Sequence, residues 1–257
     1  MPYAKKRIYK RRRPLRRKPT KAKMVTAIVK RELHRNIENK QITNYVNNYQ
    51  IKSNNTGDLG NDMFNCIPNI RQGDALSERV GNTLKPLSLR ISAQFFPVVV
   101  SNSGPYQPYY FDMYVFKSKL TNAVPANLLT EISAFLQPEQ SQTTTFDGSP
   151  QNYFQNSNRS MVTVVAKKRF RIMPIIQDQQ TDITTIDNKA VSSAFITLPL
   201  TKHIKSTLKY QNSNDVTPNN CSLFAFMVGV KSDSIASVVP TTYGRVNWTS
   251  TLVYEDA

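Results

Sequence analysis

The chain has 257 residues, a length that suits one large β domain or two small domains. Its 34 Lys and Arg residues against 17 Asp and Glu give a formal charge of +17, but this excess is concentrated at the start. Residues 1–31 hold 14 Lys or Arg and no acid, whereas residues 32–257 hold 20 basic and 17 acidic residues. The sequence is therefore a basic arm joined to a nearly neutral body.

Composition argues against several classes of protein. No apolar run approaches the ~20 residues that a membrane-spanning helix needs, so no membrane insertion is expected. No apolar segment follows the N-terminal charges, so secretion by a signal peptide is not expected either. The two cysteines, Cys66 and Cys221, make no disulfide framework and indicate a reducing compartment.

The arm is predicted to bind nucleic acid. Residues 1–23 have almost nothing to bury and many adjacent like charges, so they should be disordered or extended when alone. Each cation near a phosphate releases condensed counterions, which makes binding tight and strongly dependent on salt. The predicted contact residues of the arm are Lys5, Lys6, Arg7, Lys10, Arg11, Arg12, Arg13, Arg16, Arg17, Lys18, Lys21 and Lys23.

Two aromatic residues, Tyr3 and Tyr9, lie among these charges and could stack on unpaired bases. Nothing in the arm reads a base sequence or chooses between DNA and RNA. A solubilising tail or a bare nuclear-localisation signal is the alternative interpretation. An anionic membrane is a weaker one, because the arm lacks apolar residues for one face of a helix.

A short junction follows the arm. Residues 24–38 place Val25, Ile28, Val29 and Leu33 near helical spacing, which predicts a short amphipathic helix or turn. We therefore divide the chain into residues 1–39, the nucleic-acid-binding arm with its junction, and residues 40–257, the folded body.

The body is dominated by strand patterns. The clearest is 87–95, where Leu87, Leu89, Ile91, Ala93 and Phe95 alternate with polar residues. Further strands are predicted at 109–116, 161–166 continued by 169–172, 194–200, 204–210, 223–230 and 245–254, with weaker candidates at 42–51 and 143–146.

One internal helix is predicted, at 125–137, ending before Pro138. Eight or nine strands with little helix favour an all-β antiparallel sandwich, jelly roll or barrel. Trp248, on the last strand, is expected in the core rather than as a base platform. The long loops at 52–80, 97–108, 138–158 and 176–192 are interpreted as contact surfaces.

The sequence contains no motif for metal binding, nucleotide binding or catalysis. A zinc site needs about four ligands at constrained spacing, but His34, His203 and the two cysteines are isolated. Nucleotide-binding glycine loops are also lacking, so we expect no catalytic residues, no metal, no cofactor and no enzyme activity.

Four acids could hold a divalent cation between subunits, although solvated loop acids are the favoured interpretation. These acids are Asp74, Glu78, Glu255 and Asp256.

A second basic cluster lies in the body and consists of Lys167, Lys168, Arg169 and Arg171. On a strand it would place positive charge along one face or rim of a sheet and add to nucleic-acid binding. The cluster could equally be an ordinary polar strand face that binds nothing. Lys202, Lys205 and Lys209 could extend the cluster.

The stretch 70–95 carries a family resemblance. A Gln72-Gly73 turn, the triplet Arg79-Val80-Gly81 and the alternating strand 87–95 follow one another. In this order they resemble the capsid (coat) proteins of small circular Rep-encoding single-stranded DNA viruses, the circovirus-like group. The Arg-rich N-terminus is similar too, as is Leu208-Lys209-Tyr210 followed by an Asn-rich loop and the apolar strand 223–230.

The resemblance implies a single antiparallel eight-stranded jelly roll of the viral capsid type, with residues 40–257 as its shell domain. It implies self-assembly into a closed icosahedral shell of about 60 subunits, with the arms inward on the genome. The implied partners are copies of the chain, viral single-stranded DNA with RNA as an alternative, host nuclear import factors and a cell-surface receptor. The implied locations are the virion and, during assembly, the host nucleus.

Two other interpretations stay open. One is a nucleic-acid-binding protein with a basic tail that does not assemble. The other is an enzyme on a β scaffold, which would need a polar pocket with convergent titratable groups.

Overall fold

The computed structural model describes residues 25–26, 39–52, 63–97, 99–101, 109–119, 135–137, 146, 150–172, 175–177, 193–231 and 242–256. The chain divides into two units, Met1–Glu38 and Asn39–Ala257. In the first unit, Val25 and Thr26 are helical, and the rest of the predicted junction helix lies outside the described residues. The fold below is that of the second unit.

The second unit is built from strands in two main sheets. The five-stranded sheet has the order β1 (Asn39–Lys52), β11 (Thr242–Asp256), β3 (Thr83–Pro97), β8 (Ala194–Pro199), and β9 (Leu208–Lys209) also pairs with β3. The four-stranded sheet has the order β2 (Met63–Asn65), β10 (Phe224–Lys231), β5 (Tyr109–Ser118), β6 (Val162–Ile172). A short parallel pair, β4 (Val99–Ser101) and β7 (Ile175–Gln177), and two 3-10 turns, η1 (Pro150–Tyr153) and η3 (Thr201–His203), complete the described elements.

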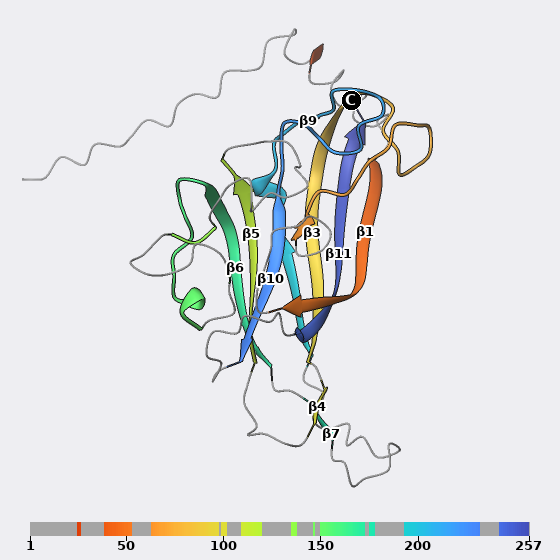
Figure 1. Ribbon diagram of the computed structural model, residues 1–257. Coiled ribbons are helices and arrows are strands. Elements are labelled where there is room, and N and C mark those ends of the chain that lie inside the picture. Colours follow the sequence, from red (N-terminus) through yellow and green to blue (C-terminus); the bar gives the residue numbers. More distant parts are fainter. Residues whose placement is uncertain are drawn as a thin grey trace, which may run out of the picture. The chain divides into compact units, whose positions relative to one another are not determined.

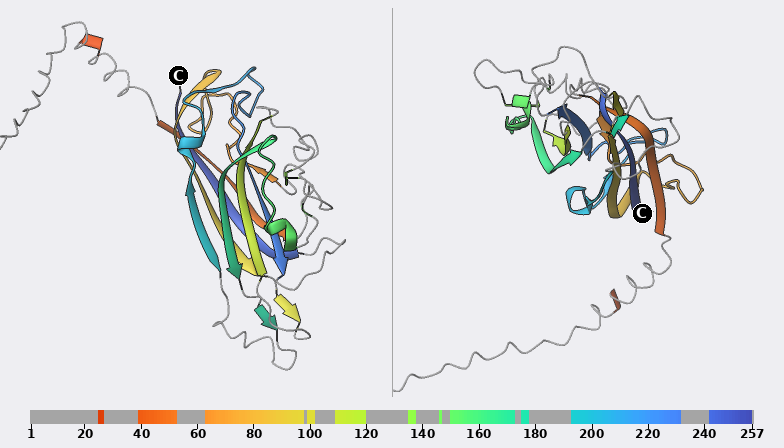
Figure 2. Two further views of the ribbon diagram at one scale, coloured as in Figure 1. Left: turned by 90° about the vertical axis from the view of Figure 1, so that its left-hand side faces the viewer. Right: turned by 90° about the horizontal axis from the view of Figure 1, so that it is seen from below.

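The strand order is that of a jelly roll. Without β4, β7 and β9, eight strands remain, and every pair among them is antiparallel. In chain order, one sheet contains the first, eighth, third and sixth strands, and the other contains the second, seventh, fourth and fifth. Figure 1 shows β5, β6 and β10 on one side and β1, β3 and β11 on the other, and Figure 2 gives two further views. The predicted eight-stranded jelly roll is confirmed.

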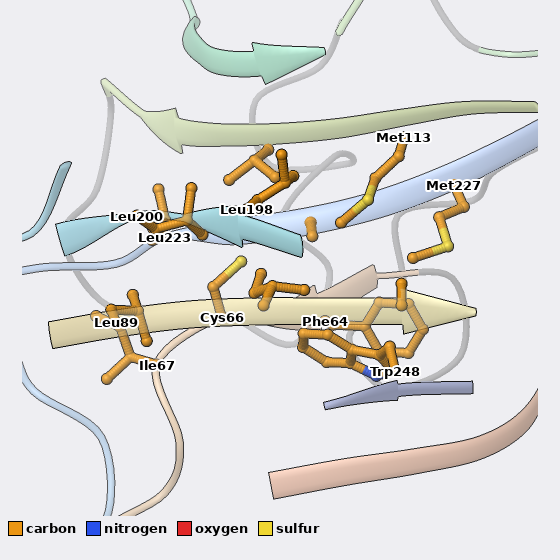
Figure 3. Close-up of a cluster of buried hydrophobic side chains, with 14 of the residues drawn as sticks. Phe64, Cys66, Ile67, Leu89, Met113, Leu198, Leu200, Leu223, Met227 and Trp248 are labelled. Carbon is orange, nitrogen blue, oxygen red and sulfur yellow. The ribbon is translucent and has the colours of Figure 1, made fainter. Parts of the chain in front are cut away.

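The main core lies between the two sheets. The predicted alternation in β3 holds, because Leu89, Ile91 and Phe95 are buried on its inward side. Phe95 packs its ring 4.6 Å from that of Phe170 on β6, which joins the two sheets. Figure 3 shows this cluster, with Phe64 and the buried Trp248 side by side; their ring centroids are 4.6 Å apart. Trp248 is a core residue, as predicted.

A second cluster explains why β5 and β10 are apolar on both sides. Their outward residues, among them Phe116 and Phe226, are buried under Phe135, Phe146 and Tyr153 from the connecting segments. The rings of Phe135 and Phe226 meet edge-on, 4.7 Å between centroids. The chain therefore covers the outward side of β5 and β10 with its own side chains.

Two predicted elements differ from the structure. The strand predicted at 204–210 is reduced to β9, because residues 201–207 form η3 and the bends that follow it. The start of η3 is bound to β3: the Leu200 N–H donates to the Leu89 carbonyl, and the Leu89 N–H donates to the Thr201 hydroxyl. The end of the predicted helix 125–137 is not helical, since Leu136 forms an antiparallel bridge with Ser157. The rest of that helix lies outside the described residues.

The other strand predictions are confirmed, including the weak one at 42–51, which is part of β1. Of the weak candidate at 143–146, only Phe146 is described, and it is not in a strand. Within the described residues, no helix has the length and apolar character to cross a membrane.

Candidate nucleic-acid interface

The predicted contact residues fall into two groups in the structure. The twelve basic residues of the arm, with Tyr3 and Tyr9, lie outside the described residues, so the arm stays a sequence prediction. The second basic cluster is described in full, and β6 positions all four of its residues.

Strand geometry divides this cluster. In the β5–β6 register, Arg169 stands opposite Asp112, and Lys167 stands opposite Tyr114. Because side chains alternate along a strand, Lys167, Arg169 and Arg171 share the outward face of the sheet. Lys168, opposite the core residue Met113, points to the other side. All four side chains retain exposure, since β6 is the last strand of its sheet.

Asp112 neutralises part of the cluster. Its carboxylate is fully buried, with 0% exposure, and forms a two-point ion pair with Arg169: Nε donates to Oδ1 at 2.7 Å and Nη2 to Oδ2 at 2.8 Å. Lys167 Nζ lies 3.1 Å from Oδ2. A buried carboxylate needs cations and hydrogen bonds to compensate it, so Lys167 and Arg169 stabilise the buried Asp112.

Two aromatic rings also contact the cations that bind Asp112. Lys167 lies 4.7 Å from the ring centroid of Tyr114, and Arg169 lies 5.0 Å from that of Tyr153. The Tyr114 hydroxyl donates to Asp112, at 3.2 Å. Burial, together with the Asp112 charge, raises the pKa of Tyr114, and the Arg169 charge opposes this shift. The hydrogen bond to Asp112 is in turn the main reason that the pKa of Arg169 is raised.

The four cations therefore have two roles. Lys167 and Arg169 are bound to Asp112, whereas Lys168 and Arg171 are exposed and carry charge that is available to a polyanion. Sequence reasoning missed Asp112, although a lone acid inside an aromatic strand is a recognisable signal of a buried ion pair. Its partners could not be named without the β5–β6 register.

The proposed extension of the cluster lies elsewhere. Lys202, Lys205 and Lys209 are exposed, and they lie on or beside η3 and β9 rather than on β6. Burial lowers the pKa of His203, and the charges of Lys202 and Lys117 lower it further. Lys202 on η3 and Lys117 on β5 therefore both act on His203.

The triplet 79–81, singled out in the family resemblance, has a structural role. Arg79 is fully buried and donates through Nη1 to the Gly81 carbonyl at 2.6 Å. Its Nη2 donates to the carbonyls of Asn212, at 2.8 Å, and Asp215, at 2.9 Å. Its guanidinium also lies 4.2 Å from the centroid of the Tyr210 ring. Arg79 therefore ties the triplet to the Asn-rich loop, two of the stretches that carry the resemblance.

Three of the four acids considered for a divalent cation have protein partners, and one of them, Glu78, accepts from the Ala75 N–H at 3.1 Å. Asp256 accepts from Lys40 Nζ at 2.8 Å and from the Val80 N–H at 2.9 Å, beside the start of β1. Glu255 pairs with Lys85 at 2.7 Å. Across the described part of the chain, no three His, Cys, Asp or Glu residues gather as metal ligands. Cys66 and Cys221 are free and buried, and burial raises the pKa of the Cys66 thiol.

A polar depression is lined mainly by the segment that precedes β6. Its described lining consists of Gln137, Asn156, Asn158, Arg159 and Ser160. It contains amides, one hydroxyl and one cation, and no described acid or imidazole that could act as a general base.

Comparison with known proteins gives a weak and consistent result. No family model and no curated protein matches the chain. Among solved structures, turnip yellow mosaic virus matches with 11% identity, 85% coverage of this chain, 94% of that chain and a TM-score of 0.30. Cocksfoot mottle virus matches with 12% identity, 86% coverage of this chain, 96% of that chain and a TM-score of 0.33. Merkel cell polyomavirus VP1 in complex with disialyllactose matches with 10% identity, 84% coverage of this chain, 95% of that chain and a TM-score of 0.26. At these TM-scores the fold assignment depends on the strand order of the chain itself.

Proposed function

We propose that this chain is a viral capsid protein that assembles with its own copies into a closed shell around nucleic acid. The observation that carries the proposal is the combination of a complete jelly-roll strand order with an N-terminal segment of 14 cations and no acid. Jelly rolls of this kind serve as capsid domains, and also as lectin and cupin domains. The concentrated positive charge favours the capsid role, because a lectin or cupin has no need of a polyanion-binding segment.

The finer assignment follows the sequence resemblance. We propose that the shell belongs to a circovirus-like virus, has about 60 subunits and packages single-stranded DNA through residues 1–39. The same segment would act as a nuclear-import signal, which places the protein in the virion and in the host nucleus. A cell-surface receptor would bind the exposed loops.

We also propose that the chain is not an enzyme. Two features support this: the described polar depression lacks a general base, and the carboxylates Asp112, Glu255 and Asp256 are all engaged in ion pairs. Exposed acids and imidazoles that converge on one pocket would be needed for hydrolytic chemistry.

Electron microscopy of the purified full chain tests the assembly. Uniform closed particles are expected, formed more readily when single-stranded DNA is present. Monomers under all conditions of salt and nucleic acid would instead favour a non-assembling nucleic-acid-binding protein with a basic tail.

The role of the arm has a separate test. Removing residues 1–23, which contain 12 of the cations, should reduce the slope of log affinity for single-stranded DNA against log salt. The reduction approaches about 8 if every cation contacts a phosphate at ~0.7 per contact. An unchanged slope would show that the arm does not bind nucleic acid.

A further inference from the structure

The outward face of the five-stranded sheet differs from the rest of the body. Its central rows are formed by hydroxyl side chains that meet across strands: Thr43 Oγ1 lies 3.1 Å from Thr251 Oγ1, and Ser92 Oγ lies 3.3 Å from Thr197 Oγ1. These contacts fix which residues of β1, β11, β3 and β8 point outward. The face is defined as the outward positions of these four strands, and is called the hydroxyl face below.

Two exposed aromatic rings lie at the two edges of this face. Tyr45 on β1 is 65% exposed, and Phe195 on β8 is 71% exposed. In the strand register, Tyr45 pairs with Thr249, Thr249 with Ser92, and Ser92 with Thr197. Thr197 is two residues from Phe195 on β8. With strands ~4.8 Å apart and ~3.3 Å per residue, the two rings are roughly 16 Å apart. Among the described residues of these four strands, they are the large hydrophobic side chains that are exposed.

The charge of the hydroxyl face is positive. Arg90 is exposed in its centre, and Arg245, also exposed, donates to the Asn48 side chain at 3.1 Å. The sequences of the four strands contain acids only at the end of β11, where Glu255 pairs with Lys85. Asp256 is bound to Lys40. The guanidinium groups of Arg90 and Arg245 therefore face solvent without a described carboxylate beside them.

We propose that the hydroxyl face binds single-stranded nucleic acid, with Tyr45 and Phe195 stacking on bases and Arg90 and Arg245 contacting phosphates. This inference rests on the proposed function and assigns to the body a second, base-contacting site. Aromatic platforms combined with cations are the common arrangement for binding unpaired strands without sequence preference. The separation of the rings fits within the footprint of a few nucleotides.

Other occupants fit less well. The basic arm of a second copy would be repelled by Arg90 and Arg245. An apolar surface of another subunit would bury Thr249, Ser92 and Thr197 without matching their hydroxyl groups. In single-stranded nucleic acid, the phosphates can bind the cations and accept from the hydroxyl groups, while the unpaired bases can stack on the aromatic rings at the two edges.

The test uses the full chain and an oligothymidylate that carries photoreactive iodouracil, followed by mass spectrometry of the crosslinked peptides. Adducts are expected on the peptides that contain Tyr45 and Phe195. Tyr45→Ala and Phe195→Ala should each weaken oligothymidylate binding about 10-fold, within the range known for base stacking, and Tyr45→Phe should restore it. Affinity for duplex DNA should not change, because its bases are not free to stack.

The matched control is Phe154, whose side chain is 81% exposed on the segment beside η1. Phe154→Ala should leave binding unchanged. Arg90→Gln and Arg245→Gln should each lower the salt slope by about 0.7, the value for one phosphate contact on a single strand. The variants change exposed positions, so thermal unfolding should match that of the parent chain.

Three results would overturn the inference. The first is adducts confined to the arm or to Phe154. The second is unchanged affinity after both ring substitutions. The third is loss of closed particles in the ring variants, which would assign the face to contacts between copies. The arm-truncation slope is measured independently, so failure of this site and failure of the proposed arm function give different patterns.

Discussion

The two outward faces of this jelly roll have opposite characters. On the four-stranded sheet, Phe226 and other outward residues of β5 and β10 are buried by connecting segments, while the outward cations of β6 stay exposed and two of them, Lys167 and Arg169, bind the buried Asp112. On the five-stranded sheet, the outward residues are mostly hydroxyls and amides, with Tyr45 and Phe195 exposed at the edges. The difference teaches that one face is largely covered by the chain's own side chains, whereas the other keeps polar groups and two aromatic rings exposed.

The largest expected difference concerns a phenylalanine on each face. Phe226→Ala should lower the free energy of unfolding by about 3–5 kcal/mol, because it leaves a cavity among packed rings. Phe195→Ala should change it by less than ~0.5 kcal/mol, since the ring is exposed. Urea unfolding followed by the fluorescence of Trp248, at matched protein concentration, measures both. Equal losses would show that the hydroxyl face is part of a core.

The second prediction separates the cations of β6. Replacing Lys167 and Arg169 by Met leaves the buried Asp112 uncompensated and should cost about 3 kcal/mol, the lower end of the range for broken buried pairs, because the pair is partly hydrated. Adding Asp112→Asn should recover part of that loss.

The matched control replaces Lys168 and Arg171 by Met on the same strand. Stability should change by less than ~0.5 kcal/mol, while the affinity for single-stranded DNA falls with a smaller salt slope. The reverse pattern, with stability lost in the control and DNA affinity lost in the first pair, would contradict the division of roles.

The sequence predicted the hydroxyl face better than the covered one. Alternation in 87–95 indicates one buried and one polar side, and the structure confirms it. In β5 both sides are mostly apolar, which indicates burial but not what provides it. Phe135 and Phe146 come from distant segments, which were predicted as a helix and a weak strand, and neither pattern indicates that they pack on β5. The Asp112–Arg169 pair, 57 residues apart in the chain, depends on a register that no local pattern encodes. Tyr45 and Phe195 come to the same face only through the alignment of β1, β11, β3 and β8, which the sequence does not reveal.

The third prediction concerns alkaline pH and Tyr114. Its folded-state pKa is raised above the ordinary value of 10.0, mainly by burial and then by Asp112. Above about pH 10 the unfolded chain therefore loses a proton that the folded chain keeps, and stability falls as pH rises. Tyr114→Phe should make this decline shallower, by up to about 1.4 kcal/mol per pH unit. At pH 7 the variant should lose about 1 kcal/mol with its hydrogen bond. Parallel stability curves for parent and variant above pH 10 would refute this assignment.

The smallest expected effect tests whether the hydroxyl face is solvated. Thr43 and Thr251 meet at 3.1 Å between hydroxyls, and both are replaced by Val, which keeps the branched shape. In water each hydroxyl exchanges its partner for solvent, so the double variant should change stability by less than ~0.5 kcal/mol. Urea unfolding of the two single variants and the double variant gives the coupling between the residues. A coupling above ~1 kcal/mol would mean that the pair is shielded from water, and a strand of nucleic acid could then not reach the hydroxyl groups between Tyr45 and Phe195.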